Sequence, residues 1–112
     1  MRIGDWGSGN ATVSGGGSLS ADSDNFDDIR VGNHAGSIGT LTVTGSGTTV
    51  TTGGTDNTIQ VGWAGTGTLN LQDGAQLSTL QLEAGRHGDG TINIDGASSF
   101  AVVSTQNGLF SG

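Results

Sequence analysis

The chain has 112 residues, of which 23 are Gly and none is Pro or Cys, and its formal net charge is −7. This charge argues against nucleic acids and anionic membranes as partners, because their phosphate groups would be repelled. The lack of Cys excludes disulfide bonds. No apolar run approaches the length of a membrane span, and no basic segment with an apolar one after it follows Met1, so we expect neither membrane insertion nor a signal peptide here. Charged residues make up only 12% of the chain, which favours one ordered domain over residues 1–112 rather than disorder.

A glycine-rich block recurs four times along the chain, and its clearest copy spans residues 59–77. Each copy contains three short segments in which apolar residues alternate with polar ones, and glycines separate these segments. Alternation with a period of two predicts a strand with one buried face. Strands this short are stabilised by stacking on the equivalent strand of the next copy. The sequence therefore predicts an all-β fold, a parallel β-solenoid of about four coils with three short strands each. The expected coils span residues 2–28, 29–58, 59–79 and 80–103, and residues 104–112 begin a further coil or form a terminal tail.

Corresponding residues of the four copies set the expected register. The first and third copies have ten residues between the ends of the first and second strands, whereas the second has twelve. The fourth also has twelve, from Leu82 to Ile94. We expect these additions at corners, because a strand that gains one residue turns every following side chain to the other face. The second strands are expected to stack through Val13, Val43, Leu71 and Ile94, at intervals of 30, 28 and 23 residues.

The apolar residues of the alternating segments are expected to share one interior. Burial of one such side chain contributes about 1.5–3 kcal/mol to stability. Thr and Asn occupy many of the positions between them, where they can stack outside the core. The expected inward residues are Ile3, Val13, Leu19, Ile29, Val31, Leu41, Val43, Val50, Ile59, Val61, Leu69, Leu71, Leu77, Leu80, Leu82, Ile92, Ile94 and Phe100.

The first coil holds an aromatic candidate and an acidic candidate. Trp6 follows the glycine that ends the first strand, and an exposed Trp can stack on a sugar ring, although a Trp that braces the corner is the favoured reading. Carboxylates close together in the following loop can supply oxygen ligands to Ca²⁺. Phe26 interrupts an EF-hand-like spacing and the calcium-binding nonapeptide is missing, which favours a solvated loop over a calcium site. The candidate calcium ligands are Asp22, Asp24, Asp27 and Asp28.

The later coils add His34, Trp63 and a polar corner near residue 87. Trp63 has the same two interpretations as Trp6. His34 and His87 belong to coils that are not neighbours, so we expect no shared metal site and no resident cofactor. The fourth coil places several titratable groups in one expected corner insertion, where a His can act as a general acid or base. A polar turn is the favoured reading of this group, which consists of Glu83, Arg86, His87 and Asp89.

The string of residues 61–75, V-G-x-x-G-x-G-T-L-x-V-x-x-G-A in outline, resembles the repeats of bacterial autotransporter passenger domains. It is similar in particular to a repeat of type V secretion and PEP-CTERM-associated surface proteins. The resemblance extends from Ile3 to about Phe100. It implies a right-handed parallel β-helix that is secreted or displayed on the surface of a Gram-negative bacterium. It further implies a role in adhesion, aggregation or biofilm formation.

The function expected from these features is that of a non-enzymatic structural or adhesive surface module. No pair of carboxylates recurs in a way that would build a glycosidase site, since Asp73 and Asp95 are turn residues. One alternative is a glycan-binding module that uses Trp6 and Trp63. Another is a filament subunit that stacks end to end, since we expect unpaired strands at both ends of the repeat array. The first coil starts in mid-repeat, which we interpret as a fragment of a longer protein. The expected partners are other copies of the chain, or a host or surface glycan or protein.

Overall fold

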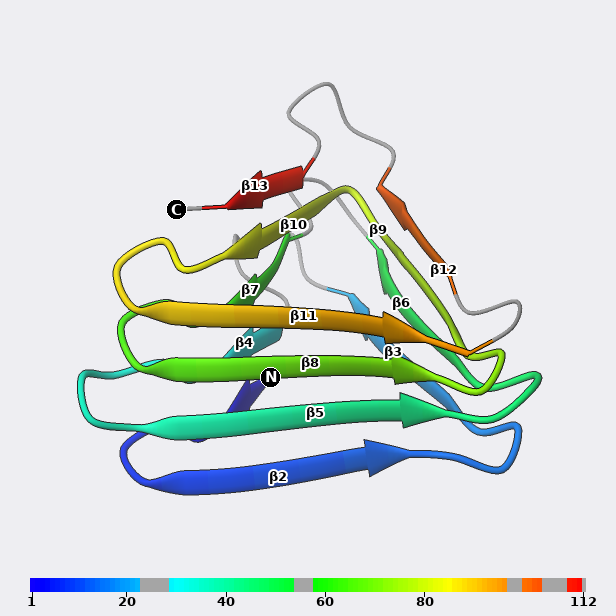
Figure 1. Ribbon diagram of the computed structural model, residues 1–112, viewed down its shortest axis with the longest axis horizontal. Coiled ribbons are helices and arrows are strands. Elements are labelled where there is room, and N and C mark those ends of the chain that lie inside the picture. The colour runs from blue at the N-terminus through cyan, green and yellow to red at the C-terminus, as the bar shows by residue number, and fades with distance from the viewer. Residues whose placement is uncertain (23–28, 54–57, 97–99, 104–108, 112) are drawn as a thin grey trace.

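The computed structural model describes residues 1–22, 29–53, 58–96, 100–103 and 109–111, and within them all regular structure is β-strand. The strands form three parallel sheets, here called A, B and C (Figure 1). Sheet A contains β1 (Arg2–Ile3), β4 (Ile29–Val31), β7 (Thr58–Val61), β10 (Gln81–Ala84) and β13 (Leu109–Ser111). Sheet B contains β2 (Ser8–Val13), β5 (Ile38–Thr44), β8 (Thr66–Gln72) and β11 (Asp89–Asp95). Sheet C contains β3 (Ser18–Asp22), β6 (Thr49–Gly53), β9 (Gln76–Thr79) and β12 (Phe100–Val103).

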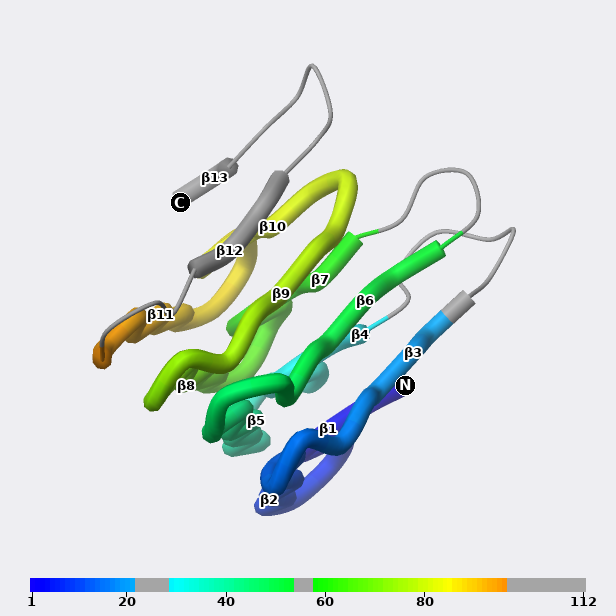
Figure 2. Tube along the Cα trace, turned by 90° about the vertical axis from the view of Figure 1, so that its right-hand side faces the viewer, coloured from blue at the N-terminus to red at the C-terminus, as the bar shows by residue number. Residues whose placement is uncertain are grey.

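The chain visits sheets A, B and C in turn, so each strand pairs with the strand three places further along the sequence. We call one passage through the three sheets a rung: β1–β3, β4–β6, β7–β9 and β10–β12. The rungs lie above one another in the side view of Figure 2. In sheet B the expected register is confirmed, because the second strands pair through the residues at intervals of 30, 28 and 23. These partners are Val13 with Val43, Val43 with Leu71, and Leu71 with Ile94.

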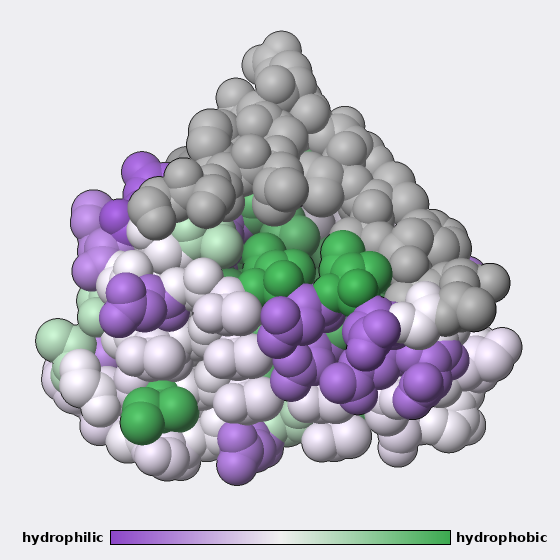
Figure 3. All heavy atoms as spheres, viewed as in Figure 1, coloured by the Kyte–Doolittle hydropathy of each residue, from purple (hydrophilic) through white to green (hydrophobic). Residues whose placement is uncertain are grey.

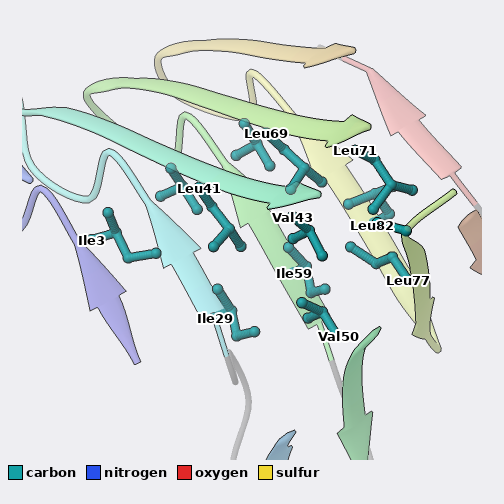
Figure 4. Packing of buried hydrophobic residues seen from close by; sticks show 13 residues of the cluster. Ile3, Ile29, Leu41, Val43, Val50, Ile59, Leu69, Leu71, Leu77 and Leu82 are labelled. Carbon is teal, nitrogen blue, oxygen red and sulfur yellow. The ribbon is translucent and has the colours of Figure 1, made fainter. Parts of the chain in front are cut away.

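The core fills the space between the inner faces of the three sheets (Figure 4). Alternation along each strand turns every second side chain inward, and twelve of the expected inward residues are almost fully buried. Ala75, which follows the turn after β8, joins them although the apolar pattern does not indicate it. The confirmed core residues are Ile3, Ile29, Val31, Leu41, Val43, Val50, Ile59, Val61, Leu69, Leu71, Leu77 and Leu82.

Some of the expected inward residues are less buried because they lie on the outermost strands. Val13 and Leu19 of the first rung are half-buried, since no earlier strand packs on β2 or β3. At the other end, Ile94 keeps its column but is 50% exposed, because β11 is the last strand of sheet B. Ile92 on the same strand is half-buried and packs against the core. The side chain of Phe100 lies outside the described residues.

The register expected for the first strand of the fourth rung is wrong by two residues. Leu82 pairs with Ile59, and Ala84 pairs with Val61, so Leu80 precedes the strand and is only half-buried. The pattern misleads because a small Ala occupies an inward position that Val or Ile fills in the other rungs. With the true register, ten residues separate Ala84 from Ile94, as in the first and third rungs. The fourth rung therefore has no corner insertion.

The corner between sheets A and B is built on the pattern G-x-x-G-x-G. It spans residues 4–9, 62–67 and 85–90, and residues 32–39 form a version two residues longer. At Gly62 the backbone has φ of +77°, and a Cβ there would collide with the carbonyl of Asp89 in the next rung. Positive φ and this close approach both require glycine. The tight corner brings the residue that follows this glycine next to the outer face of sheet A.

Candidate ligand-binding face

The cationic and aromatic polar residues of this chain gather in one region, which we call the A face. It consists of the outward side chains of sheet A together with the side chains of the adjoining A–B corners. Its members come from all four rungs, because the same strand and the same corner recur in each rung. The A face holds all three cationic residues of the sequence, both His and both Trp: Arg2, Arg30, Arg86, His34, His87, Trp6 and Trp63.

A chain of side-chain hydrogen bonds crosses the A face from the fourth rung to the second. Arg86 Nη1 donates to Glu83 Oε1 at 3.0 Å. The second oxygen of this carboxylate, Oε2, accepts from Gln60 Nε2 at 3.1 Å. Gln60 Oε1 in turn accepts from Arg30 Nε at 2.7 Å. Outward residues of β10, β7 and β4 are thus joined in the order of the sheet.

The same chain continues to the first rung through the second A–B corner. Arg30 Nη1 donates to Asn33 Oδ1 at 3.1 Å, and Asn33 Nδ2 donates to Asp5 Oδ1 at 2.6 Å. Asp5 also faces His34, with 3.5 Å between Nε2 and Oδ1, and Arg2, with 4.0 Å between Nη1 and Oδ2. We call the whole series, from Arg86 to Asp5, the polar ladder. It links all four rungs.

Three outward residues of the A face are buried although they point away from the core. Thr58 is 5% exposed, Gln60 is 4% exposed and Glu83 is 6% exposed. Gln60 and Glu83 are hydrogen-bonded to Arg30 and Arg86, whose guanidinium Cζ atoms lie 4.4 Å and 5.4 Å from the centre of the Trp63 ring. Guanidinium groups are attracted to the face of an indole ring. The A face is therefore a two-layered structure, with a buried polar floor below Trp and Arg.

A cleft of about 310 Å³ opens between these two layers. Hydroxyl, amide, carboxylate, guanidinium and indole groups all contribute to its wall. Within the floor, Thr58 Oγ1 donates to Gln81 Oε1 at 3.1 Å. The cleft therefore presents one aromatic ring among several polar and charged groups. The lining residues are Arg30, Thr58, Gln60, Trp63, Gln81, Glu83 and Arg86.

The two Trp residues of the A face differ in their surroundings. Trp6 is 77% exposed and stacks on His34, with 3.5 Å between ring centres and 14° between ring planes. Trp63 is only partly exposed, meets His87 edge-on at 4.8 Å, and lines the cleft. Trp63 is thus the one that braces its corner, whereas Trp6 presents a large aromatic surface to solvent. Both remain candidate glycan contacts.

No metal site is found among the described residues, which include the two histidines but not the side chains of the candidate calcium ligands. Asp22 ends β3, but its side chain is outside the described residues, as are Asp24, Asp27 and Asp28. In the parts of the chain that the structure describes, no three His, Cys, Asp or Glu side chains come together as a metal site requires. His34 and His87 contact different Trp residues.

The polar group expected in an inserted corner of the fourth rung is distributed differently. Glu83 belongs to β10 and to the ladder, Arg86 and His87 lie in a corner of ordinary length, and Asp89 begins β11. Sequence reasoning missed the ladder because the ladder depends on two pairings, that of Glu83 with Gln60 and that of Gln60 with Arg30. The correct alignment of Gly85 with Gly62, both at positive φ, would have placed these residues in one column.

Comparison of the chain with protein-family models, with curated proteins and with solved structures gave no match. No helix long and apolar enough to cross a membrane occurs among the residues that the structure describes.

Proposed function

We propose that the chain is a right-handed parallel β-helix of about four coils that serves as a non-enzymatic adhesive module. The regular order in which the strands visit the three sheets supports the helix, and the likeness of residues 61–75 to autotransporter passenger repeats supports its handedness. The same likeness supports secretion or display on the surface of a Gram-negative bacterium. In such a module the stacked rungs are the scaffold, and binding resides in side chains on its surface.

The binding site in this proposal is the cleft of the A face together with its two Trp residues, and the ligand is a saccharide. The carrying observation is that Trp63 lines a cleft of the A face whose wall is otherwise polar, while Trp6 presents a 77% exposed ring at another corner of that face. Sugars combine apolar ring faces, which stack on indole, with hydroxyls that need hydrogen-bonding partners. On the A face, Trp6 and Trp63 provide the rings, and the half-buried amide of Gln81 provides a hydrogen-bonding group that lines the cleft.

A binding role fits the carboxylates of the A face better than a hydrolytic role. Glycosidases need one carboxyl group as the acid and another as the base or nucleophile, both facing the scissile bond. Both oxygens of Glu83 accept hydrogen bonds within the ladder, and Asp5 is held by Asn33. Neither group is placed as one member of a facing pair. We therefore propose binding without turnover.

Glycan-array binding together with quenching of Trp fluorescence tests this proposal. Because the chain has only two Trp residues, the variants Trp6→Phe and Trp63→Phe each leave one emitter, so that quenching reports on one place of the A face. We expect a bound saccharide to change the emission of both single-Trp variants, and Thr68→Ala on sheet B to bind as the parent chain does. The proposal would be contradicted if the protein bound no glycan on the array. It would also be contradicted if the protein bound glycans equally well after both Trp residues were replaced by Ala.

Self-association is a second candidate, which the ends of the stack favour. The inward residues Val13 and Leu19 are only half-buried on end strands, and end strands carry unpaired backbone groups. A second copy that stacked on this end would cover them. In sedimentation velocity experiments over a hundredfold range of protein concentration, the sedimentation coefficient should then increase with concentration. A sedimentation coefficient that stays constant across the range would rule this candidate out.

A further inference from the structure

We propose that the saccharide bound by the A face carries an acidic group, a carboxylate or a sulfate, and that Arg86 is its principal contact. This inference rests on the proposed function, since it names the chemical class of the ligand for the same cleft. It also assigns different roles to two arginines of the A face, Arg86 at the cleft and Arg2 at the far end. Three observations support it: the distribution of charge, the geometry of Arg86, and the floor of the cleft.

The distribution of charge is the first observation. The chain has ten acidic and three basic residues, yet all three basic residues lie on the A face. If these arginines served only to reduce the net charge of −7, they would have no reason to share one sheet and its corners. Two of them, Arg30 and Arg86, line the same cleft and approach the same Trp63 ring. Among the residues that line the cleft, these two arginines outnumber the one carboxylate, Glu83, so the cleft attracts an anion on an otherwise acidic protein.

The geometry of Arg86 is the second observation. Its Nη1 is fixed at 3.0 Å from Glu83 Oε1, and the side chain of Glu83 is only 8% exposed. The side chain of Arg86 is 54% exposed and lines the cleft. A guanidinium group has five N–H donors in a planar fork that fits a carboxylate or sulfate. One hydrogen bond and one ring contact thus hold the group in place while its other donors stay accessible, which lowers the entropic cost of binding.

The floor of the cleft is the third observation, and it favours a saccharide over an acidic peptide. The half-buried amide of Gln81 lines the cleft together with Arg86, and an amide both donates to and accepts from the hydroxyls of a sugar, whereas Thr58 and Gln60 are almost fully buried and shape the floor. Trp6 adds an exposed indole on the same face. A peptide carboxylate would engage the arginine but would use little of this polar floor.

Isothermal titration calorimetry with matched ligands and matched variants tests the inference. The ligands are a galacturonate hexamer and its methyl ester, which differ in charge but share the same sugar rings. The variants are Arg86→Gln and Arg2→Gln, which remove the same charge from the same face. Arg2 is a suitable control because its side chain is 58% exposed, it belongs to the first rung, and it does not line the cleft. Heparin hexasaccharide, sodium sulfate and poly-glutamate complete the set, so that sulfated sugar, free anion and acidic peptide are distinguished.

The inference predicts that the galacturonate hexamer or the heparin hexasaccharide binds about tenfold or more tightly than the methyl ester. Arg86→Gln should weaken this binding by about tenfold, Arg2→Gln by less than about twofold, and Arg86→Lys should restore part of it. Thermal melting of each variant shows whether the fold is kept. If Arg86→Gln unfolds, the folded Arg86→Lys variant and the ester comparison still decide the matter.

Different failures have different meanings. Equal binding of the acid and its ester, with no effect of Arg86→Gln, would overturn the acidic ligand and leave the saccharide-binding proposal intact. Poly-glutamate that binds as well as the acidic sugars, or sodium sulfate that displaces them fully at equal concentration, would overturn the acidic saccharide in favour of a general anion site. If none of the saccharides binds, both the inference and the proposed function are wrong.

Discussion

The A face and the outer face of sheet B share one backbone arrangement but differ in how their side chains meet water. On sheet B the outward positions hold mainly short polar residues, and none of them is buried (Figure 3). Their contacts are sparse: Asn93 donates to Asn70 at 2.9 Å, and Asn70 to Thr42 at 3.4 Å. On the A face, Gln60 and Glu83 are buried under Trp63 and the arginines.

Side-chain length explains the contrast. Rungs that stack in parallel place equivalent residues of neighbouring strands about 4.8 Å apart. Thr and Asn reach only the adjacent residue of their own column and leave the rest to solvent. Arg, Gln, Glu and Trp extend across several positions, so they form both the ladder and the layer that covers it. A candidate binding site therefore forms on this regular stack of strands at the face where the outward side chains are long.

The corner that separates these two faces should give the largest effect. Gly62→Ala places a methyl group against the backbone of Asp89 at a residue with positive φ, so we expect a loss of about 3 kcal/mol or more in unfolding free energy. Gly7→Ala, in a corner where the added Cβ has no neighbour within 4 Å, should cost less than about 1 kcal/mol. Urea denaturation followed by circular dichroism measures both. Similar midpoints for the two variants would show that the corner is not as tight as described.

Removal of the cover of the A face should give the next effect. Trp63→Ala exposes the polar floor and removes the ring that Arg30 and Arg86 approach, so we expect a loss of about 2 kcal/mol. Trp6→Ala, at the more exposed Trp, should cost less than about 1 kcal/mol. Thermal melting compares the pair. Equal losses would mean that Trp63 does not act as a cover.

Two amides of the third rung allow the faces themselves to be compared. Gln60→Ala leaves the buried Glu83 with one fewer donor and separates it from Arg30, which should cost about 1–2 kcal/mol. Asn70→Ala removes a half-exposed amide from sheet B and should cost less than about 0.5 kcal/mol. Urea denaturation at one protein concentration provides both values. If Asn70→Ala proves the more harmful, the ladder does not stabilise the A face.

The smallest effect is expected for an exposed position of sheet B. Thr91→Val keeps the β-branched shape on an outward position that is open to solvent, so the unfolding free energy should stay within about 0.5 kcal/mol of the parent. Its binding of saccharides should also be unchanged. A clear loss of binding after this substitution would move the ligand from the A face to sheet B.

Much of the fold was predictable because it depends on a repeated pattern. Val13, Val43, Leu71 and Ile94 stack as their spacing indicates, since an inward column needs an apolar residue in each rung. The prediction failed in β10, where Ala84 is too small to stand out and Leu80 looks like a core residue. One two-residue error was enough to hide the alignment of Glu83 with Gln60.

The candidate site was harder to predict than the fold. Trp6 and Trp63 were recognised as residues that can stack on sugars, but the sequence alone did not place them beside the arginines. Long polar side chains form hydrogen bonds with side chains of neighbouring rungs, which lie 23 to 30 residues away in the sequence. Apolar periodicity carries no information about them. Their arrangement follows only once the register of every rung is known.

The polar ladder also has a mechanical consequence. A force along the stacking axis, as between a cell and a surface to which it is tethered, pulls on the backbone hydrogen bonds that join one rung to the next. The paired strands at the start of sheet A are short, since β1 spans two residues and β4 spans three. The contacts of Glu83 with Gln60, Gln60 with Arg30, and Asn33 with Asp5 cross the same three gaps and share the tension. Along sheet A, side chains thus add to the backbone hydrogen bonds that resist separation of the rungs.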